Sequence, residues 1–433
     1  MTKRAQFVFF FLLSLLACAS TWFYVNRILK PAQVADAAAH NRPRGNLSDL
    51  YPRWLGAREL LLHRRNPYSH EITTEIQTGY YGRPLDPARA DDPKDQEGFA
   101  YPVYVVFLLA PTVTLPFSVV QIGFRWLLVG LTGLSVLLWF RVLGWKLSCS
   151  LRILCVVLVM GSLPVVQGIK LQQLSLLVAG LLAACAGCLV SGYLFSAGVL
   201  LALATVKPQL AWPLVLWLML WAGREWPARR RFALGFGLAM VLLLCGAELL
   251  LPGWWRMFLA AIREYQQYTQ SQSVLDFLFG PVLGKVIAAF AVLGCGLGVW
   301  PLRGEDATSS GFGKAFALVL ALTVLIVPMY APYNQVLLVP AILFLARDAA
   351  QSDSVSLAAR LARLIGGLLL VWPWVATIGL SVASFWMSSG RRQSVWTLPF
   401  YSTFALPIFV FGVAWLDIWT RQRRGLPVSE AAE

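Results

Sequence analysis

The chain has 433 residues, of which 58% are hydrophobic and only 13% are charged, and its formal net charge is +15. Soluble domains are about half apolar and about a quarter charged, so this composition excludes an ordinary soluble protein and predicts a polytopic membrane protein. Basic clusters such as residues 224–231 and 421–425 lie between or after apolar runs. We therefore expect them on the cytoplasmic side of a membrane, and we expect no nucleic-acid partner.

The chain begins with Lys3 and Arg4, which precede an apolar run. This order is typical of a signal peptide, but the run continues through Tyr24, so an uncleaved signal anchor is expected. Thirteen apolar runs occur, near residues 7–24, 99–116, 120–141, 153–167, 173–190, 194–206, 209–222, 231–251, 281–300, 313–329, 334–346, 363–387 and 398–419. Basic residues near both ends favour an even number of spans, about 12, with one run re-entrant or merged with its neighbour.

Residues 25–98 are expected to form a large first loop on the outer side. Apolar residues recur there with a period close to 3.6, at Leu47, Leu50, Tyr51, Trp54, Leu55, Leu61 and Leu62. This spacing predicts an amphipathic helix on the outer leaflet. Ser48 or Asp49 would cap it, and the first backbone amides would keep the Asp49 carboxylate ionised. Asp49 is then either a plain N-cap or a general base that accepts a proton from a hydroxyl.

The same loop ends in residues 86–98, where several carboxylates stand among Pro, Ala and Gly. Without apolar neighbours, this stretch is expected to be solvated and mobile, and we predict no site there. Further along, residues 252–280 carry a Trp pair and a mixture of Arg, Glu, Tyr and Gln. Such a composition predicts a second outer segment that lies as a helix at the membrane interface.

Polar islands interrupt the later apolar runs. Lys207 stands before Pro208 between two runs, and a lysine there either snorkels to the interface or binds a phosphate in a cavity. Gln172 and Gln173 lie in another island, where their amides suit either sugar hydroxyls or a simple turn between helices.

A third island covers residues 329–340, where Tyr333 and Asn334 stand between two Pro residues. Irregular backbone at this depth is expected only where protein buries it or where it lines a cavity.

Two kinds of site are not predicted. The seven Cys lie in or beside apolar runs, and the three His match no metal-ligand spacing, so neither a disulfide framework nor a metal site is expected. No P-loop or Rossmann glycine motif is present. An enzyme of this kind is expected to use a substrate that is activated as a membrane lipid.

Five segments follow one another in an order shared with a known family: 48–68, 99–116, 168–184, 197–212 and 325–342. They hold, in turn, Asp49 with an aromatic helix closed by Asn-Pro-Tyr, a Tyr-Pro pair, a Gly/Gln segment, a Lys-Pro pair and a late Pro/Tyr loop. With Val103 in place of a second Pro, and Gln173 in place of the usual Asn, the chain resembles glycosyltransferase family 87. That family comprises polyprenyl-phosphate-mannose-dependent mannosyltransferases with the GT-C fold.

The resemblance implies an all-α polytopic membrane enzyme, a GT-C-like bundle of about 12 transmembrane helices that forms one domain over residues 1–433. It implies transfer of a hexose, mannose by the family comparison, from a polyprenyl-phosphate sugar to a lipid or glycan acceptor, with no metal or other cofactor. The enzyme would be a multi-pass protein of the bacterial plasma membrane with its site facing the periplasm.

By the same resemblance Asp49 is the catalytic base and Lys207 stabilises the departing phosphate. Together with the polar islands, it gives the substrate-binding residues expected here: Lys207, Tyr51, Gln172, Gln173, Tyr101, Tyr333 and Asn334.

Three other functions remain open at this point. A transporter or lipid flippase predicts paired ionisable groups at mid-membrane and internal symmetry, and neither is clear in the sequence. A non-catalytic partner in envelope assembly predicts that Asp49 is dispensable. An O-antigen ligase or polymerase predicts a long outer loop late in the chain, whereas the longest loop here comes first.

Overall fold

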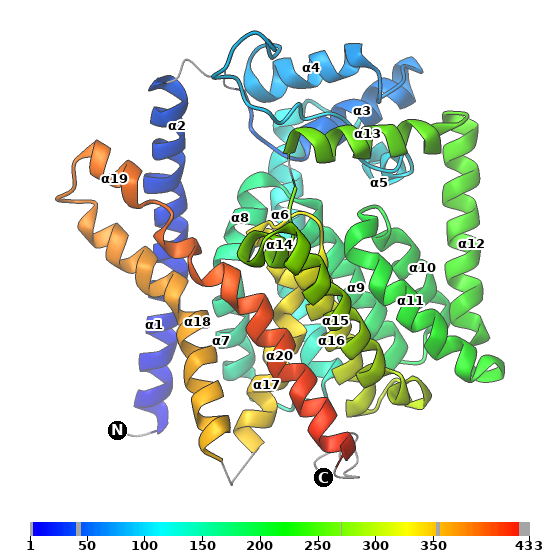
Figure 1. Ribbon diagram of the computed structural model, residues 1–433, viewed down its shortest axis with the longest axis vertical. Helices are drawn as coiled ribbons and strands as arrows, with labels where there is room; N and C mark the ends of the chain where they lie inside the picture. Colours follow the sequence, from blue (N-terminus) through cyan, green and yellow to red (C-terminus); the bar gives the residue numbers. More distant parts are fainter. Residues whose placement is uncertain (1–2, 40–44, 270, 352–355, 424–433) are drawn as a thin grey trace.

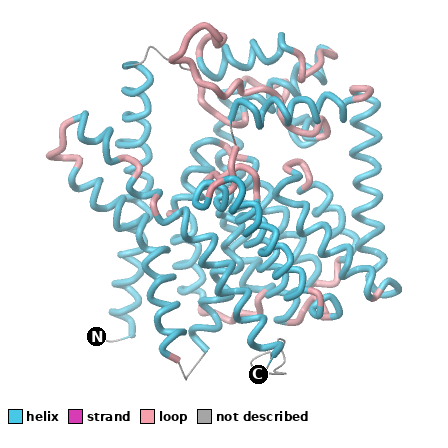
Figure 2. Tube along the Cα trace, viewed as in Figure 1, coloured by secondary structure: helices cyan, strands magenta, loops and turns pink. Residues whose placement is uncertain are grey.

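The computed structural model of the protein describes residues 3–39, 45–269, 271–351 and 356–423, and within these ranges it contains helices and no strand (Figures 1 and 2). The prediction of an all-α protein is thereby confirmed. Three helices lie across one end of the molecule: α3 (Tyr51–His63), α4 (His70–Tyr81) and α13 (Trp254–Thr269). The start of α1 (Lys3–Tyr24) and the end of α20 (Ser402–Arg423) lie together at the opposite end (Figure 1).

The other helices lie between these two ends. In chain order they are η1 (Val25–Leu29), α2 (Lys30–Ala39), α5 (Val105–Leu109), η2 (Ala110–Thr112), α6 (Phe117–Val142), α7 (Cys149–Met160), α8 (Leu163–Leu171), α9 (Leu174–Val190), α10 (Leu194–Ala204), α11 (Pro208–Arg224), α12 (Trp226–Leu250), α14 (Val274–Phe279), α15 (Pro281–Val299), η3 (Pro301–Gly304), α16 (Ser310–Ile326), η4 (Pro332–Leu338), α17 (Val339–Gln351), α18 (Leu357–Ala383), α19 (Ser389–Val395) and η5 (Leu398–Phe400). The π-helical segment η1 joins α1 and α2 into one helix.

Six helices in the described part of the chain are long and apolar enough to cross a membrane: Arg4–Ala39, Phe117–Val142, Trp226–Leu250, Pro281–Gly304, Leu357–Ala383 and Leu398–Arg423. The pair α7 and α8, bent by 59° at its break, would make a seventh. The predicted number of about 12 is not confirmed by this measure. The helices α9, α10 and α16 are also apolar, but they are shorter than the roughly 20 residues of a straight crossing.

The centre of the molecule is α16, in which every residue from Gly311 to Leu325 is buried. It contacts α11, α15, α17 and α20. Large apolar side chains on the outer helices are instead exposed, for example Leu242 on α12, Val282 on α15 and Leu368 on α18. A buried apolar centre within an apolar outer surface is the pattern of a protein whose outer helices face lipid.

Close contact between α10 and α12 depends on glycine. A Cβ atom added to Gly198 would clash with the backbone of α12, and one added to Gly235 would clash with the backbone of α10. Small residues at such crossings allow two helix backbones to approach closely within a membrane. This packing fixes α10, and α10 precedes Lys207.

The predicted span at residues 99–116 is wrong. The segment forms only the five-residue α5 and the three-residue η2, because Pro102 and Pro111 interrupt the backbone hydrogen bonds that a longer helix needs. Its apolar residues are buried against protein instead of lipid, as α5 packs on α3. The segment between the first helix and the next long helix therefore continues to Pro116. It also starts later than residue 25, because the first helix runs on to Ala39.

The two predicted outer helices are present, as α3 and α13, with one correction. The helix α3 does not lie exposed on a leaflet surface, since it is buried from Pro52 to Ala57 and even Arg53 and Glu59 are buried. The helix α13 exposes Trp255 and Leu259 on one side. Its other side covers the cavity described next.

Candidate active site

The segment that carries Asp49 is bonded to the junction between α8 and α9. The Asp49 amide donates to the carbonyl oxygen of Leu171 (2.9 Å), and the Ser48 hydroxyl donates to Oε1 of Gln172 (2.6 Å). On its other side, the Asn46 amide donates to the carbonyl of Gly79 at the end of α4. The chain before α3 is thus fixed against two helices that are distant in sequence.

The expected cap of α3 is wrong. Leu50 occupies the N-cap position, and no side chain accepts a hydrogen bond from the first turn. The Asp49 carboxylate points elsewhere and accepts from the Tyr80 hydroxyl (3.3 Å) and from the Gln173 amide. Both donors are neutral, and no ion pair to Asp49 occurs within the described residues.

Lys207 lies in the break between α10 and α11, where Pro208 starts the second helix. The break gives its backbone a non-helical conformation, and its side chain is 6% exposed. Its ammonium donates to the Ser175 hydroxyl (2.7 Å) and to Oε1 of Gln173 (3.3 Å), and it lies 5.2 Å from the centre of the Tyr333 ring. Lys207 is therefore a buried cation whose hydrogen-bond partners are all neutral.

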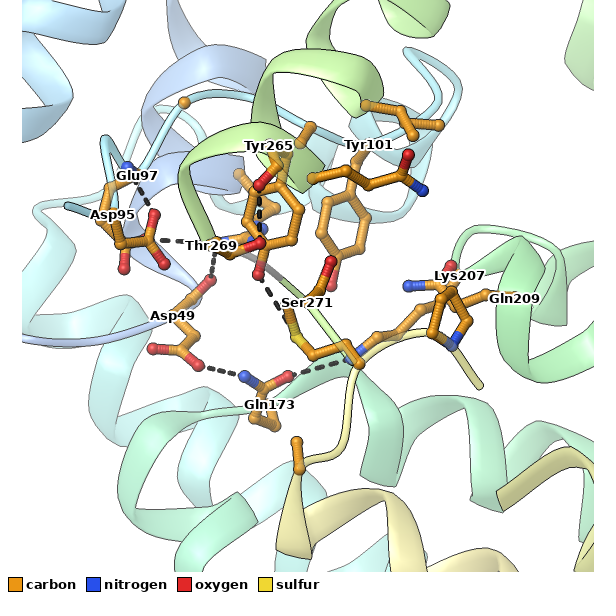
Figure 3. A pocket seen from close by; sticks show the side chains of 18 of the residues that line it. Asp49, Asp95, Glu97, Tyr101, Gln173, Lys207, Gln209, Tyr265, Thr269 and Ser271 are labelled. Atoms are coloured by element: carbon orange, nitrogen blue, oxygen red, sulfur yellow. Dashed lines mark hydrogen bonds and ion pairs between the residues drawn. The ribbon is translucent and has the colours of Figure 1, made fainter. Parts of the chain in front are cut away.

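Gln173 links the acid to the cation. Its side-chain amide donates to the Asp49 carboxylate, and its side-chain carbonyl accepts from Lys207, as Figure 3 shows. Gln173 is the N-cap residue of α9, and the preceding Gln172 ends α8 in a left-handed conformation (φ 50°). The sharp turn between the two helices thus directs the Gln173 side chain toward both groups.

Arg53, one turn after Asp49 on α3, forms a third part of the site. Its guanidinium donates to the backbone carbonyl of Asp49 (2.8 Å), lies 4.4 Å from the centre of the Tyr101 ring and approaches Oε2 of Glu97 at 3.9 Å. Its Nε is buried and has no hydrogen-bond partner within the described residues. The sequence analysis missed this residue, because an arginine in an amphipathic helix normally faces water.

Two further carboxylates were wrongly dismissed as part of a solvated stretch. Asp95 and Glu97 both line the cavity, and the Glu97 side chain is only 13% exposed. Their segment is held by the Tyr81 hydroxyl, which donates to the Asp95 carbonyl, and by the Gln77 amide, which donates to the Gln96 side chain. These aromatic and amide partners come from α4, so no local sequence pattern around residues 86–98 reveals them.

These side chains surround a cavity of about 630 Å³ beneath α13 (Figure 3). The side of α13 that faces it contributes Phe258, Ile262, Tyr265, Tyr268 and Thr269, and residues 328–333 close another side. The volume lies within the range of small-molecule sites, and the lining combines aromatic surface with a few convergent polar groups, which is typical of a binding site.

The cavity raises the pKa values of its acids. Burial raises the pKa of Asp49, while the charges of Arg53 and Lys207 and the hydrogen bonds from Gln173 and Tyr80 oppose that shift. The pKa of Glu97 is raised well above its usual range by burial and by the charges of Asp95 and Asp49. Carboxylates with raised pKa values inside a cleft are a common feature of catalytic sites. Such groups accept protons more readily than ordinary ones.

Strained backbone also concentrates here. Four non-glycine residues of the described chain have positive φ, and three of them adjoin the site: Leu47, Glu97 and Gln172. Non-glycine residues in this region cost about 1–2 kcal/mol each and persist where surrounding contacts hold them. The structure maintains this local geometry in spite of its cost.

The residues expected to bind substrate divide into two groups. Lys207, Gln173, Tyr101 and Tyr333 line the cavity with Asp49. Gln172, Tyr51 and Asn334 do not line it: Gln172 holds Ser48, Tyr51 packs against Phe117, and Asn334 accepts from Ser175. The last three support the walls of the cavity. Within the described residues, no group of three or more His, Cys, Asp or Glu side chains is arranged to hold a metal ion.

A comparison with protein families identifies one match. The model of glycosyltransferase family 87 matches residues 99–328, which is just over half of the chain. The matched range contains Gln173 and Lys207 and ends shortly before Tyr333, whereas Asp49 precedes it. No curated protein and no solved structure matches the chain. The resemblance to this family is confirmed, and the match includes the segments 99–116, 168–184 and 197–212 in full, whereas segment 48–68 lies outside it.

Proposed function

The chain belongs to glycosyltransferase family 87 and is a membrane glycosyltransferase, and we propose that it transfers a hexose from a polyprenyl-phosphate sugar to an acceptor hydroxyl. The hexose is mannose by comparison with the family. The acceptor is a glycan or a glycosylated lipid. Asp49 is the general base, and Lys207 binds the phosphate of the donor.

The observation that carries this proposal is the bridge through Gln173. It joins a carboxylate and an ammonium that line one cavity and that, within the described residues, form no ion pair and have only neutral hydrogen-bond partners. A buried lysine of this kind favours an anionic ligand such as a phosphate diester, because an opposite charge in a low-dielectric site offsets its desolvation. With the phosphate bound at Lys207, the Asp49 carboxylate would be close enough to accept a proton from the hydroxyl that attacks the anomeric carbon.

The proposed reaction is a single displacement. The acceptor oxygen forms a bond to the anomeric carbon of the sugar, and its proton passes to the Asp49 carboxylate. The bond between the anomeric carbon and the phosphate oxygen breaks, and its electron pair leaves with the polyprenyl phosphate. Lys207 stabilises the negative charge that grows on this leaving group. Attack opposite to the leaving group inverts the anomeric configuration.

The aromatic residues of the cavity fit the sugar. The rings of Tyr101 and Tyr333 lie on the cavity wall, each near a cation, Arg53 and Lys207 respectively. Tyrosine combines an apolar face, which packs on the C–H face of a sugar ring, with a hydroxyl that exchanges hydrogen bonds with sugar hydroxyls. We propose that these two rings hold the transferred sugar between the base and the phosphate site.

We further propose that the end carrying α3, α4 and α13 faces the outside of the cell, which is the periplasm in a bacterium. Arg4 and Arg421 lie near the opposite end, where α1 starts and α20 ends (Figure 1), and basic residues favour the cytoplasmic side. The six long helices, the bent pair α7 and α8 and the shorter apolar helices α9, α10 and α16 would together give ten crossings, an even number close to the predicted count of about 12.

The test is a transfer assay with the purified protein and a panel of labelled sugar donors. The panel contains polyprenyl-phosphate mannose, glucose and galactose together with the matching nucleotide sugars. We expect label to move only from polyprenyl-phosphate donors, with polyprenyl-phosphate mannose the best of them. Transfer from a nucleotide sugar, or none from any polyprenyl-phosphate sugar, would refute the proposal.

A further inference from the structure

A second cavity adjoins the first on its outer side. Its volume is about 410 Å³, and it lies between the start of α4, the segment 96–100 and α13. Gly98, Ala100 and Tyr268 line both cavities, so only a thin wall of chain separates them. Lys207 and its neighbours Gln173 and Tyr333 line the first cavity alone.

The side chains of the second cavity are mainly hydroxyls and amides, with an aromatic floor. Thr73, Gln96 and Gln267 contribute short polar groups, and Tyr68 stacks edge-on against Phe99 with ring centres 5.2 Å apart. The Gln267 amide has no hydrogen-bond partner within the described residues and stands exposed at the rim. Such groups both donate and accept hydrogen bonds, as sugar hydroxyls do, and aromatic rings fit the C–H faces of sugars.

Charge distinguishes the two cavities. The first brings Lys207 and Arg53 close to three carboxylates, whereas the second has one carboxylate, Glu264, and one imidazole, His70, both exposed. A phosphate would find no buried cation in the second cavity. A lipid chain would find little apolar wall, since only Phe99, Ala100 and Ala261 are apolar there. An uncharged polar ligand fits this lining best.

We propose that the second cavity is an acceptor subsite that holds a sugar unit beyond the one that reacts. The preferred acceptor is then a glycan, free or lipid-linked, with at least two sugar residues. Its reacting hydroxyl reaches Asp49 past Tyr268, and its next sugar lies over Phe99 within reach of Thr73 and Gln267. The proposal rests on the proposed function, because it extends the acceptor side of the same reaction.

The test compares acceptors of different length. The probes are synthetic octyl glycosides of mannose, glucose and galactose that carry one, two or three sugar residues, assayed with polyprenyl-phosphate mannose. For the sugar series that is used, we expect kcat/KM to rise at least tenfold from one residue to two. Equal use of one-sugar and two-sugar acceptors would overturn the subsite.

Two variants locate the effect. Gln267→Trp fills the cavity and is expected to raise the KM for the two-sugar acceptor at least tenfold while the KM for the donor stays unchanged. Thr73→Ala is expected to raise the KM for the two-sugar acceptor about threefold to tenfold, because the hydrogen bond between the Thr73 hydroxyl and the sugar is lost. Thr78→Ala is the matched control, because both hydroxyls donate to the carbonyl four residues earlier on α4, and Thr78 lies outside the cavity. An equal rise in the donor KM would contradict the assignment.

A binding measurement separates this proposal from the proposed function. Isothermal titration of the two-sugar and one-sugar glycosides into the Asp49→Asn protein requires no turnover. Tighter binding of the longer glycoside, abolished by adding Gln267→Trp, supports the subsite even if no sugar is transferred from a polyprenyl phosphate. Absence of binding by every glycoside in the panel, or equal binding of both lengths, overturns the subsite even where transfer occurs.

Discussion

Two clusters of charge, each with a buried lysine, lie at opposite ends of the helical bundle. One surrounds the cavity below α13. The other joins α16, α17 and α20 near the opposite end, where Lys314 contacts Asp348 (2.9 Å) and Asp417 (3.1 Å), and Arg421 contacts the same two acids. In the second cluster each acid contacts at least two cations. In the first, the Asp49 carboxylate and the Lys207 ammonium form hydrogen bonds only to neutral groups within the described residues.

The difference separates a structural cluster from a binding site. A closed set of ion pairs satisfies its own charges and holds three helices together. In the cavity, hydrogen bonds to neutral groups compensate only part of the cost of burying the Asp49 and Lys207 charges. The cavity therefore has unpaired charge to offer a ligand, whereas the network around Lys314 has none. Four sets of variants test this difference between the cavity and the Lys314 network.

The largest effect is expected for Asp49→Asn. Loss of the general base should lower kcat by about 10²- to 10⁴-fold. Thermal stability should stay unchanged, because the amide keeps the shape of the side chain and Asp49 has no ion pair to lose. Sugar transfer and the thermal midpoint in detergent are measured together. Retention of full activity would rule out Asp49 as the base.

The next effect concerns stability alone. Lys314→Met removes the buried central cation of the network and leaves Arg421 as the cation that Asp348 and Asp417 share, which should cost up to about 3 kcal/mol of unfolding free energy. The readout is the thermal midpoint by intrinsic tryptophan fluorescence in detergent, where a fall of several degrees is expected. Lys285→Met on α15 is the control, because Lys285 is exposed and its substitution should leave the thermal midpoint unchanged. An equally stable Lys314→Met protein would show that the network is dispensable.

A smaller effect is expected for Lys207→Ala. Loss of a charged hydrogen-bond donor at the phosphate site should raise the donor KM by about 10- to 100-fold and should affect the acceptor KM little. Lys285→Ala serves as the control, since Lys285 is exposed on α15 and does not line the cavity. If the donor affinity of Lys207→Ala equals that of the native protein, Lys207 is a structural lysine.

The smallest effect is a shift of the pH profile. Asp49 acts as a base only when ionised, and burial raises its pKa. Activity should therefore be present above that raised pKa and be lost as the pH falls through it, at a pH above the value of about 3.9 for an ordinary Asp. Gln173→Leu removes a hydrogen bond that lowers this pKa, so the acidic limb of kcat/KM should move to higher pH. An unmoved limb would show that Gln173 does not contact the ionised base.

The parts of the site predicted from sequence are those in which a polar residue interrupts an apolar run. Lys207 and Gln173 were predicted in this way, since a polar side chain between apolar helices avoids contact with lipid by facing a cavity. Asp49 was found for a partly wrong reason: its residue type and position indicated a base, but the structure gives it no capping role. The left-handed turn at Gln172, which aligns these groups, has no local sequence signal.

The errors arise where tertiary contacts decide. Residues 99–116 are as apolar as a membrane span, but this apolar surface is buried against α3, and composition alone does not distinguish protein from lipid as the partner. Asp95 and Glu97 appeared solvated because the aromatic and amide residues that surround them come from α4 and α13. Hydropathy marks thirteen apolar runs, whereas six described helices, or seven with the bent pair, are long and apolar enough to cross, because several runs form short or broken helices.

The first helix has a consequence for the lipid environment. At about 1.5 Å per residue, its 36 residues span roughly 54 Å, whereas the hydrocarbon of a bilayer is about 30 Å thick. The projecting part is α2, and Gln33 on α2 accepts a hydrogen bond from Lys170 at the end of α8, two residues before the turn that holds Asp49. We expect hydrophobic mismatch that shifts or tilts this helix to be transmitted to that turn. Turnover is then expected to depend on the acyl-chain length of the surrounding lipid.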